Sequence, residues 1–223
     1  MPRSSATRPT RRQREPLSRE RIARAALALI DAEGLEACTM RRLGASLGVE
    51  AMALYHHLPT KGDLLDAVME LLLDEMDMPT RAEAPPLQRV RRVMRSYWEI
   101  AVRHPRAFIL LAARRFNTDR AFRLYEQLLE AFADAGLDAA GSARWFRLIG
   151  GFASGAGMAY AASSEAVADA TSLRLEHAPD RIPYPHVRAV APYLRVQNLD
   201  AGFEFGMDRL MAQLTLELHG ERR

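Results

Sequence analysis

The chain has 223 residues and a mass of 25.0 kDa, with 48% hydrophobic and 26% charged residues. This length excludes a mini-protein that depends on disulfides or a metal, and it fits one or two domains with a sizeable core. The net charge of +3 is uneven: residues 1–61 carry 11 basic and 6 acidic residues, whereas residues 62–223 carry 20 and 22. The basic first part indicates an anionic partner, either nucleic acid or a membrane surface.

A single cysteine, Cys38, excludes an internal disulfide framework and suits a reducing cytoplasm. We expect it to be a small buried thiol rather than a redox switch. The first 16 residues lack the apolar region of a secretory signal. The longest uncharged stretch, residues 148–164, contains several glycines and falls just short of the roughly 18 apolar residues of a membrane span. These features predict a cytoplasmic protein.

Residues 1–17 are expected to form a disordered basic arm, because they combine five arginines with three prolines. Two interpretations of the arm remain open. It is either a solvated tail or a segment that contacts phosphates or enters a minor groove.

The next segment, residues 18–78, has the pattern of four helices. Ser18 precedes apolar residues that recur at helical spacing, and Gly34 ends this first helix. Thr39 is placed to cap a second, short helix, which Gly48 ends.

A third short helix is predicted at about residues 50–57, because Pro59 ends the pattern. Residues 60–63 then resemble a capping box, in which a threonine hydroxyl and a carboxylate satisfy free amides at a new helix start. The fourth helix carries a leucine-rich stripe and is expected to stop before Pro79.

After a linker at residues 81–86, the remaining chain, residues 86–223, keeps a helical pattern. Residues 165–186 contain three prolines and are expected to be a loose connection. No convincing strand alternation is present. Helices are predicted at about residues 87–103, 105–115, 118–135, 139–164, 187–196 and 200–218. We therefore predict an all-α protein, with a three-helix helix-turn-helix head, a helical body and about nine to ten helices.

The two short helices joined at Gly48 form a helix-turn-helix arrangement, whose second helix can enter a major groove. Arg41 and Arg42 lie near the start of the helix that would cross the DNA backbone, where guanidinium groups can reach phosphates or a guanine edge. The predicted helix start at Thr60, with Lys61 beside it, can hold a phosphate. The alternative is an ordinary three-helix packing unit with solvated arginines.

Residues 38–61 read CTMRRLGASLGVEAMALYHHLPTK, and residues 62–68 continue with GDLLDAV. This stretch resembles the DNA-binding signature of the TetR family of transcriptional repressors, and the resemblance covers roughly residues 18–70. Residues 103–105 (RHP) and 200–210 (DAGFEFGMDRL) resemble, more loosely, the C-terminal domain of the tetracycline-repressor-type branch.

The resemblance implies roles for individual residues of the head. Arg41 matches a position that can read a guanine, whereas the base-reading positions of the recognition helix are apolar here and offer only contacts such as one with a thymine methyl. Recognition is therefore expected to depend on Arg41, His56 and DNA shape. The matching backbone-contacting positions are Thr39, Tyr55, His57 and Lys61. The full predicted DNA-binding set is Thr39, Arg41, Arg42, Ala51, Met52, Ala53, Tyr55, His56, His57 and Lys61.

Two apolar seams in the last long helices are suited to helix–helix packing, and DNA readers of this kind bind palindromes as two-fold dimers. The alternative is an intramolecular core helix. The predicted dimer residues are Trp145, Ile149, Phe152, Ala156, Phe203, Met207, Leu210 and Leu214.

An apolar effector pocket is expected in the body, although each lining candidate alone also fits a core position. His104, the polar candidate, also fits a helix-end cap. The histidine that a tetracycline sensor uses to chelate its metal is replaced by Asp77, so tetracycline–magnesium binding is not supported. The predicted pocket residues are Met94, Tyr97, Trp98, His104, Phe108, Leu111, Phe116, Phe146 and Met158.

Taken together, the resemblance implies a homodimeric, ligand-responsive transcriptional regulator, and we expect a repressor that a small-molecule effector releases from a palindromic operator. Residues 18–78 would bind DNA, and residues 86–223 would hold the effector pocket and the dimer interface. The alternative is a general DNA-architectural protein without an effector. No catalytic set, metal-ligand spacing or phosphate-binding glycine loop is present, so we expect neither an enzyme nor a cofactor.

Overall fold

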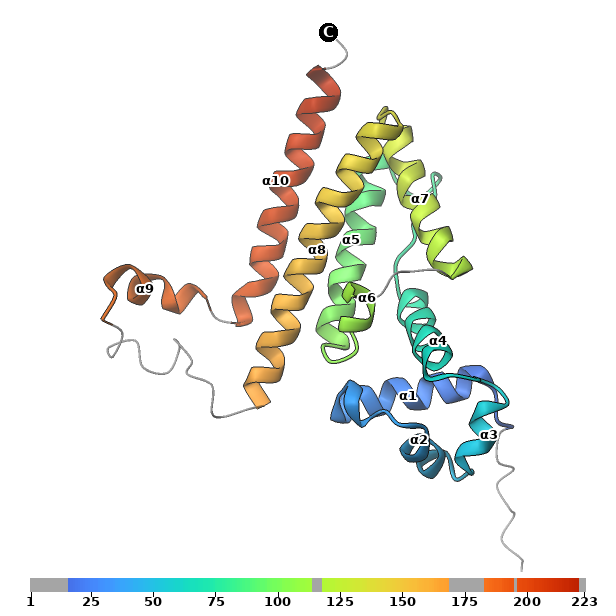
Figure 1. Cartoon of the computed structure of the whole chain (residues 1–223). Helices are drawn as coiled ribbons and strands as arrows, with labels where there is room; N and C mark the ends of the chain where they lie inside the picture. Colours follow the sequence, from blue (N-terminus) through green and yellow to red (C-terminus); the bar gives the residue numbers. More distant parts are fainter. Residues whose placement is uncertain (1–15, 114–117, 169–182, 195, 221–223) are drawn as a thin grey trace, which may run out of the picture.

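The computed structural model describes residues 16–113, 118–168, 183–194 and 196–220. Within these ranges the chain forms ten α-helices and no strand, which confirms the predicted all-α class (Figure 1). No helix among the described residues is both long and apolar enough to span a membrane. Most of the predicted basic arm, residues 1–15, lies outside the described residues.

Residues 18–78, the head, follow the predicted order of helices. The starts of the first, second and fourth helices are each capped by a side chain. Ser18 accepts a hydrogen bond from the Arg21 amide, and Thr39 accepts one from the Arg42 amide. Thr60 and Asp63 form a complete capping box. The helices are α1 (Arg19–Glu33), α2 (Met40–Leu47), α3 (Ala51–Tyr55) and α4 (Lys61–Asp74), with a 3-10 turn at Leu35–Ala37.

The core of the head lies where α1 packs against α2 and α4. Ile22, Leu43, Leu54 and Val68 are completely buried there. Gly44 of α2 permits a close approach of the two short helices, because a Cβ at this position would lie 2.8 Å from the carbonyl oxygen of Val49. The turn between α2 and α3 therefore depends on the absence of a side chain in α2.

The remaining helices form the body, residues 86–220. Two predicted helices are shorter than expected. Within the described residues, the helix predicted at 105–115 covers only Ile109–Ala113, and the one predicted at 187–196 gives way at Ala191–Tyr193 to a 3-10 turn, since Pro192 has no amide hydrogen to donate. The helices are α5 (Pro86–Arg103), α6 (Ile109–Ala113), α7 (Asp119–Ala135), α8 (Ala139–Ala168), α9 (Pro185–Val190) and α10 (Leu199–Gly220).

Helix α5 contacts α7, α8 and α10, and α8 and α10 lie side by side (Figure 1). Trp98 of α5 stacks on Phe203 of α10 with ring centroids 4.8 Å apart, and its Nε1–H donates to Asp200 at 2.9 Å. Arg91 and Arg95 of α5 form ion pairs with carboxylates of α10. These contacts orient α10 along the body.

Head and body meet at a polar cluster around His104, the residue that caps the end of α5. Its Nδ1 lies 2.7 Å from Asp31 Oδ2 of α1, and its Nε2 lies 3.2 Å from Glu75 Oε1, just beyond α4. Arg103 pairs with Glu75 at 3.0 Å, and Arg106 donates to the carbonyl oxygens of Asp31 and Ala32. The hydrogen bond to Asp31 raises the pKa of His104 above its usual range.

The close approach at Gly44 gives a first prediction. Gly44→Ala should lower the free energy of unfolding by about 1–3 kcal/mol, because overpacked sites cost this much. Gly150→Ala is the control, since a Cβ at Gly150 meets no atom within 4 Å. Alanine there should stabilise the helix by about 1 kcal/mol. Urea unfolding followed by circular dichroism measures both, and equal stability of the two variants would contradict this account of the turn.

The His104 cluster gives a second prediction. A histidine whose pKa is raised by folding stabilises the folded state fully below its ordinary pKa of 6.5, and this contribution is lost as the pH rises through the raised value. His104→Gln should therefore cost about 1–2 kcal/mol of unfolding free energy at mildly acidic pH and less at alkaline pH. His219→Gln, at the exposed end of α10, is the control and should change stability little at either pH. A cost for His104→Gln that grows with pH would contradict the charge-assisted bridge.

Candidate nucleic-acid interface and internal cavity

The ten predicted DNA-binding residues lie on α2 and α3, directly after α3, and at the starts of α2 and α4, at the end of the head away from α10 (Figure 1). Eight of them are exposed, and Ala51 and Ala53 are half-buried. Met52 of α3 is 69% exposed, although it is apolar. Helix α3 packs on α2 and buries Leu54 completely, whereas Met52 of the same helix is exposed and available to a partner.

Arg41 and Arg42 differ in their surroundings. Arg42 forms an ion pair with Glu33 of α1 at 2.5 Å, so its guanidinium is already partly neutralised. Arg41 is exposed and has no ion-pair partner in the described part of the chain. Of the two adjacent arginines, Arg41 therefore has the more available charge for a phosphate or a guanine edge.

The start of α4 presents amides and a cation together. In its capping box the Thr60 amide donates to Asp63 at 2.9 Å, and the Asp63 amide donates to the Thr60 hydroxyl at 3.1 Å. These hydrogen bonds lower the pKa of Asp63, which stays charged at neutral pH. The amides of Lys61 and Gly62 belong to the first turn, which has no intrahelical acceptors, and they are positioned to donate to an external anion.

Cys38 lies directly beneath this surface and is completely buried. Burial raises the pKa of its thiol. The group is therefore protonated and shielded at neutral pH, as expected for a packing residue rather than a reactive one.

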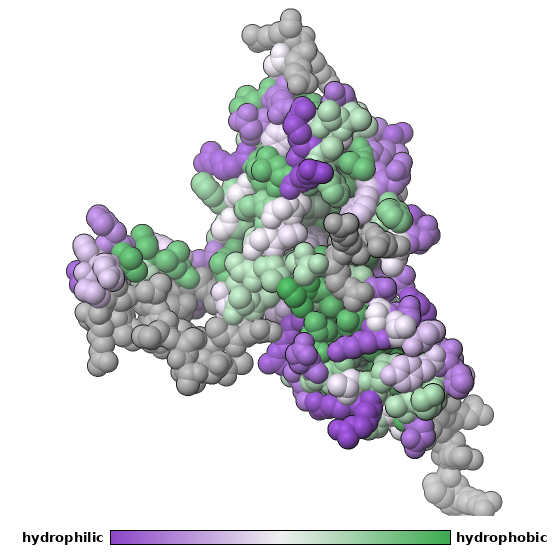
Figure 2. All heavy atoms as spheres, in the orientation of Figure 1, coloured by the Kyte–Doolittle hydropathy of each residue, from purple (hydrophilic) through white to green (hydrophobic). Residues whose placement is uncertain are grey.

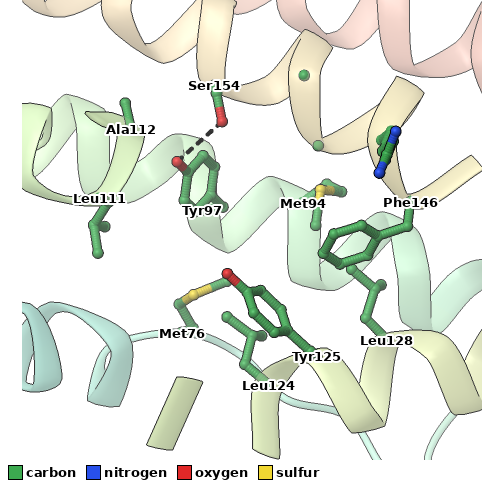
Figure 3. Close-up of a pocket in the computed structure, with 13 residues that line it drawn as sticks. Met76, Met94, Tyr97, Leu111, Ala112, Leu124, Tyr125, Leu128, Phe146 and Ser154 are labelled. Carbon is green, nitrogen blue, oxygen red and sulfur yellow. Dashed lines mark hydrogen bonds between the residues drawn. The ribbon is translucent and has the colours of Figure 1, made fainter. Parts of the chain in front are cut away.

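The body contains a cavity of about 340 Å³ between α5, α6, α7 and α8 (Figure 3). Four predicted pocket residues line it: Met94, Tyr97, Leu111 and Phe146. Tyr97 and Ser154 lie on one side of the cavity, with their hydroxyl oxygens 3.2 Å apart. Met76, Leu124 and Tyr125 line the opposite side (Figure 3).

Four other predicted pocket residues lie outside the lining of this cavity. Trp98 is stacked on Phe203, and His104 belongs to the head–body cluster. Phe108 is completely buried behind Tyr97, with ring centroids 5.1 Å apart, and Met158 is half-buried against the core. The remaining candidate, Phe116, lies outside the described residues.

Nine further residues that were not predicted from the sequence also line the cavity. Helix α7 supplies three of them at spacings of one and three residues, a pattern that could have been recognised as one helix face. Met76 follows the end of α4, where no periodicity marks it. The residues missed are Met76, Ala112, Leu124, Tyr125, Leu128, Arg147, Gly150, Gly151 and Ser154.

The predicted dimer seams pack α8 against α10 within one chain. Five of the eight residues are buried there within the single chain: Trp145, Ile149, Phe203, Met207 and Leu214. Phe152, Ala156 and Leu210 are half-buried. The exposed sides of the same two helices carry other apolar and small residues, namely Leu148, Gly151, Gly155 and Ala159 of α8 and Phe205, Ala212 and Leu216 of α10.

Asp77 is held by Arg92, whose Nε and Nη2 donate to its two carboxylate oxygens at 2.7 and 3.0 Å. The described residues contain no group of three or more histidine, cysteine, aspartate or glutamate side chains that could hold a metal ion.

Two family profiles match the chain. Residues 22–68 match the bacterial regulatory proteins of the tetR family, and residues 86–216 match the tetracyclin repressor-like C-terminal domain. The HTH-type transcriptional repressor DrrR1 of Streptomyces coeruleorubidus is 43% identical over 77 residues, which are 34% of this chain and 27% of that protein. The chain spans about a quarter to a half of the length of the curated relatives it matches.

Solved structures match over most of the chain. A possible TetR family transcriptional regulator from Streptomyces coelicolor A3(2) has a TM-score of 0.78 and 25% identity, covering 89% of this chain and 99% of that one. ActR from Streptomyces coelicolor, in complex with (S)-DNPA, has a TM-score of 0.68 and 25% identity, covering 92% and 99%. The resemblance found in the sequence is confirmed, and the chain belongs to the TetR family of bacterial regulatory proteins.

Proposed function

We propose that this protein is a ligand-responsive transcriptional regulator that represses its target genes in the cytoplasm, binding a palindromic operator as a dimer and leaving it when a small molecule fills the cavity. One observation carries the proposal. Helix α4 starts at the exposed DNA-binding surface with Lys61, and Met76, two residues beyond its last residue, lines the cavity. The two sites are therefore joined by a single helix.

Operator recognition is proposed to rest on Arg41 and on shape. Arg41 is exposed and, among the described residues, is the arginine of α2 that has no ion-pair partner, whereas Met52 and Ala53 of α3 offer apolar contacts to a thymine methyl. Such a surface reads few base edges directly, so the deformability of the operator adds to its specificity.

Release is proposed to act through Met76. A molecule in the cavity contacts this side chain and favours one position of α4 over another, which changes the separation of the two heads in a dimer. Because operator half-sites are separated by a fixed number of base pairs, a changed separation lowers DNA affinity. The ligand complex described for ActR supports this proposal by similarity.

Dimerisation is proposed to use the exposed sides of α8 and α10, defined above by Leu148, Gly151 and Gly155 of α8 and by Phe205 and Leu216 of α10. Leu148, Phe205 and Leu216 are large apolar side chains that are 51%, 62% and 65% exposed. The two glycines let helix backbones approach closely. Figure 2 shows white and green residues, near-neutral and hydrophobic in character, over this part of the body.

The operator proposal is tested by gel retardation with the DNA beside the gene that encodes the protein. We expect sequence-selective, salt-sensitive retention, and Arg41→Ala should lose about 1–3 kcal/mol of discrimination at one base pair if Arg41 reads guanine. Arg123→Ala is the control, because Arg123 is exposed on α7, and this variant should bind as the unchanged protein does. Equal retention of unrelated duplexes would reject the operator and favour a DNA-architectural protein.

The dimer face is tested by Leu216→Glu, which places a charge in the proposed interface. Analytical ultracentrifugation should show a shift from dimer to monomer, since burying an unpaired carboxylate costs several kcal/mol, about 2–5. Phe122→Glu is the matched control, because Phe122 is 56% exposed on α7. A Leu216→Glu variant that remains a dimer at the same concentration would place the interface elsewhere.

A further inference from the structure

The cavity has few polar groups, which are hydroxyl groups and one guanidinium group. Most of the lining is apolar or aromatic, and the polar side-chain atoms come from Tyr97, Tyr125, Ser154 and Arg147. Among the described residues that line the cavity, none is acidic. A cationic molecule would therefore lose its hydration without gaining a counter-charge, whereas an anion would meet a guanidinium.

Arg147 differs from the arginines of the neighbouring helix. Arg89, Arg91 and Arg95 of α5 all form ion pairs with carboxylates. Arg147 is exposed at the edge of the cavity and forms no ion pair within the described ranges. Its planar guanidinium matches a carboxylate or sulfonate, which it can bind through two parallel hydrogen bonds.

A second polar point lies seven residues further along the same helix. Ser154 of α8 and Tyr97 of α5 share one hydrogen bond at 3.2 Å, which uses one of their two hydroxyl hydrogens and leaves the other for an acceptor. Burial raises the pKa of Tyr97 to about 12, so this hydrogen is retained at neutral pH.

The wall between the two polar points is open. Residues 147, 150, 151 and 154 share one face of α8, and a Cβ at Gly150 would meet no atom within 4 Å. Seven residues of helix span about 10 Å, which is the length of two or three fused rings with their substituents. Tyr125 and Phe146, edge to face with centroids 5.3 Å apart, provide aromatic surface for such rings.

We propose that the effector is an aromatic anion of two or three rings, whose acidic group pairs with Arg147 and whose carbonyl or hydroxyl oxygen accepts a hydrogen bond from the Tyr97–Ser154 pair. This inference names the chemical class of the effector and so rests on the proposed function.

Two fluorescent probes test the charge preference on the full chain without DNA: 1-anilinonaphthalene-8-sulfonate and N-phenyl-1-naphthylamine, which has the same rings without the sulfonate. The unchanged protein should bind the sulfonate more tightly. Arg147→Gln should weaken sulfonate binding about 5- to 10-fold and change binding of the neutral probe less than about 2-fold. Arg144→Gln, one turn earlier on α8 and outside the cavity lining, is the matched control and should leave both affinities unchanged.

A substitution that fills the cavity tests whether the probes bind there. Gly150→Leu should abolish saturable binding of both probes, because its side chain occupies the space beside Arg147. If this variant unfolds on circular dichroism, Leu124→Trp fills the cavity from α7 instead. Retention of both probes by a folded, filled variant would overturn the proposal, as would an equal effect of Arg147→Gln on the two probes.

The outcome is separable from the operator test. If the protein binds its operator but shows no charge preference, only the inference about the chemical class of the effector is rejected. A protein that binds no operator but shows the Arg147-dependent preference keeps the chemistry of the cavity and loses the proposed regulatory role.

Discussion

Helix α4 is shared by the head and the body, and the other features of this protein depend on that sharing. Leu64 and Val68 are completely buried, and α4 packs against α1 in the head as well as against α6 and α7 in the body. Close-packed interiors deform little, so a helix that belongs to both parts moves as a unit. The proposed coupling between Met76 and Lys61 rests on this packing.

The arginines of this protein fall into two groups, according to whether they form ion pairs with carboxylates. Arg89, Arg91 and Arg95 of α5 form ion pairs with carboxylates of α7 and α10, and these pairs hold the helices together. Arg41 in the head and Arg147 at the cavity are exposed and have no ion-pair partner among the described residues, and each lies at a site proposed to meet an anion.

Local chemistry explains which parts of the fold could be predicted. The starts of α1, α2 and α4 depend on a side chain within three residues of its acceptor or donor, as at Ser18, Thr39 and Thr60, so they are visible in sequence. The apolar seams of α8 and α10 could also be predicted from the sequence. The pattern of an apolar seam is the same whether the helix that packs on it belongs to the same chain or to another. Trp145 and Leu214 are buried within the single chain, which the sequence pattern alone does not indicate.

By itself, the sequence determined the helical class, the helix-turn-helix head and membership of the TetR family, because these follow from helical periodicity, capping residues and a contiguous motif. Only the tertiary structure decided which side chains line the cavity, that His104 joins head to body, and that Met76 brings α4 to the cavity wall. The physical reason is distance along the chain. Tyr97 and Ser154 meet at 3.2 Å although 57 residues separate them, and no local pattern encodes such a contact.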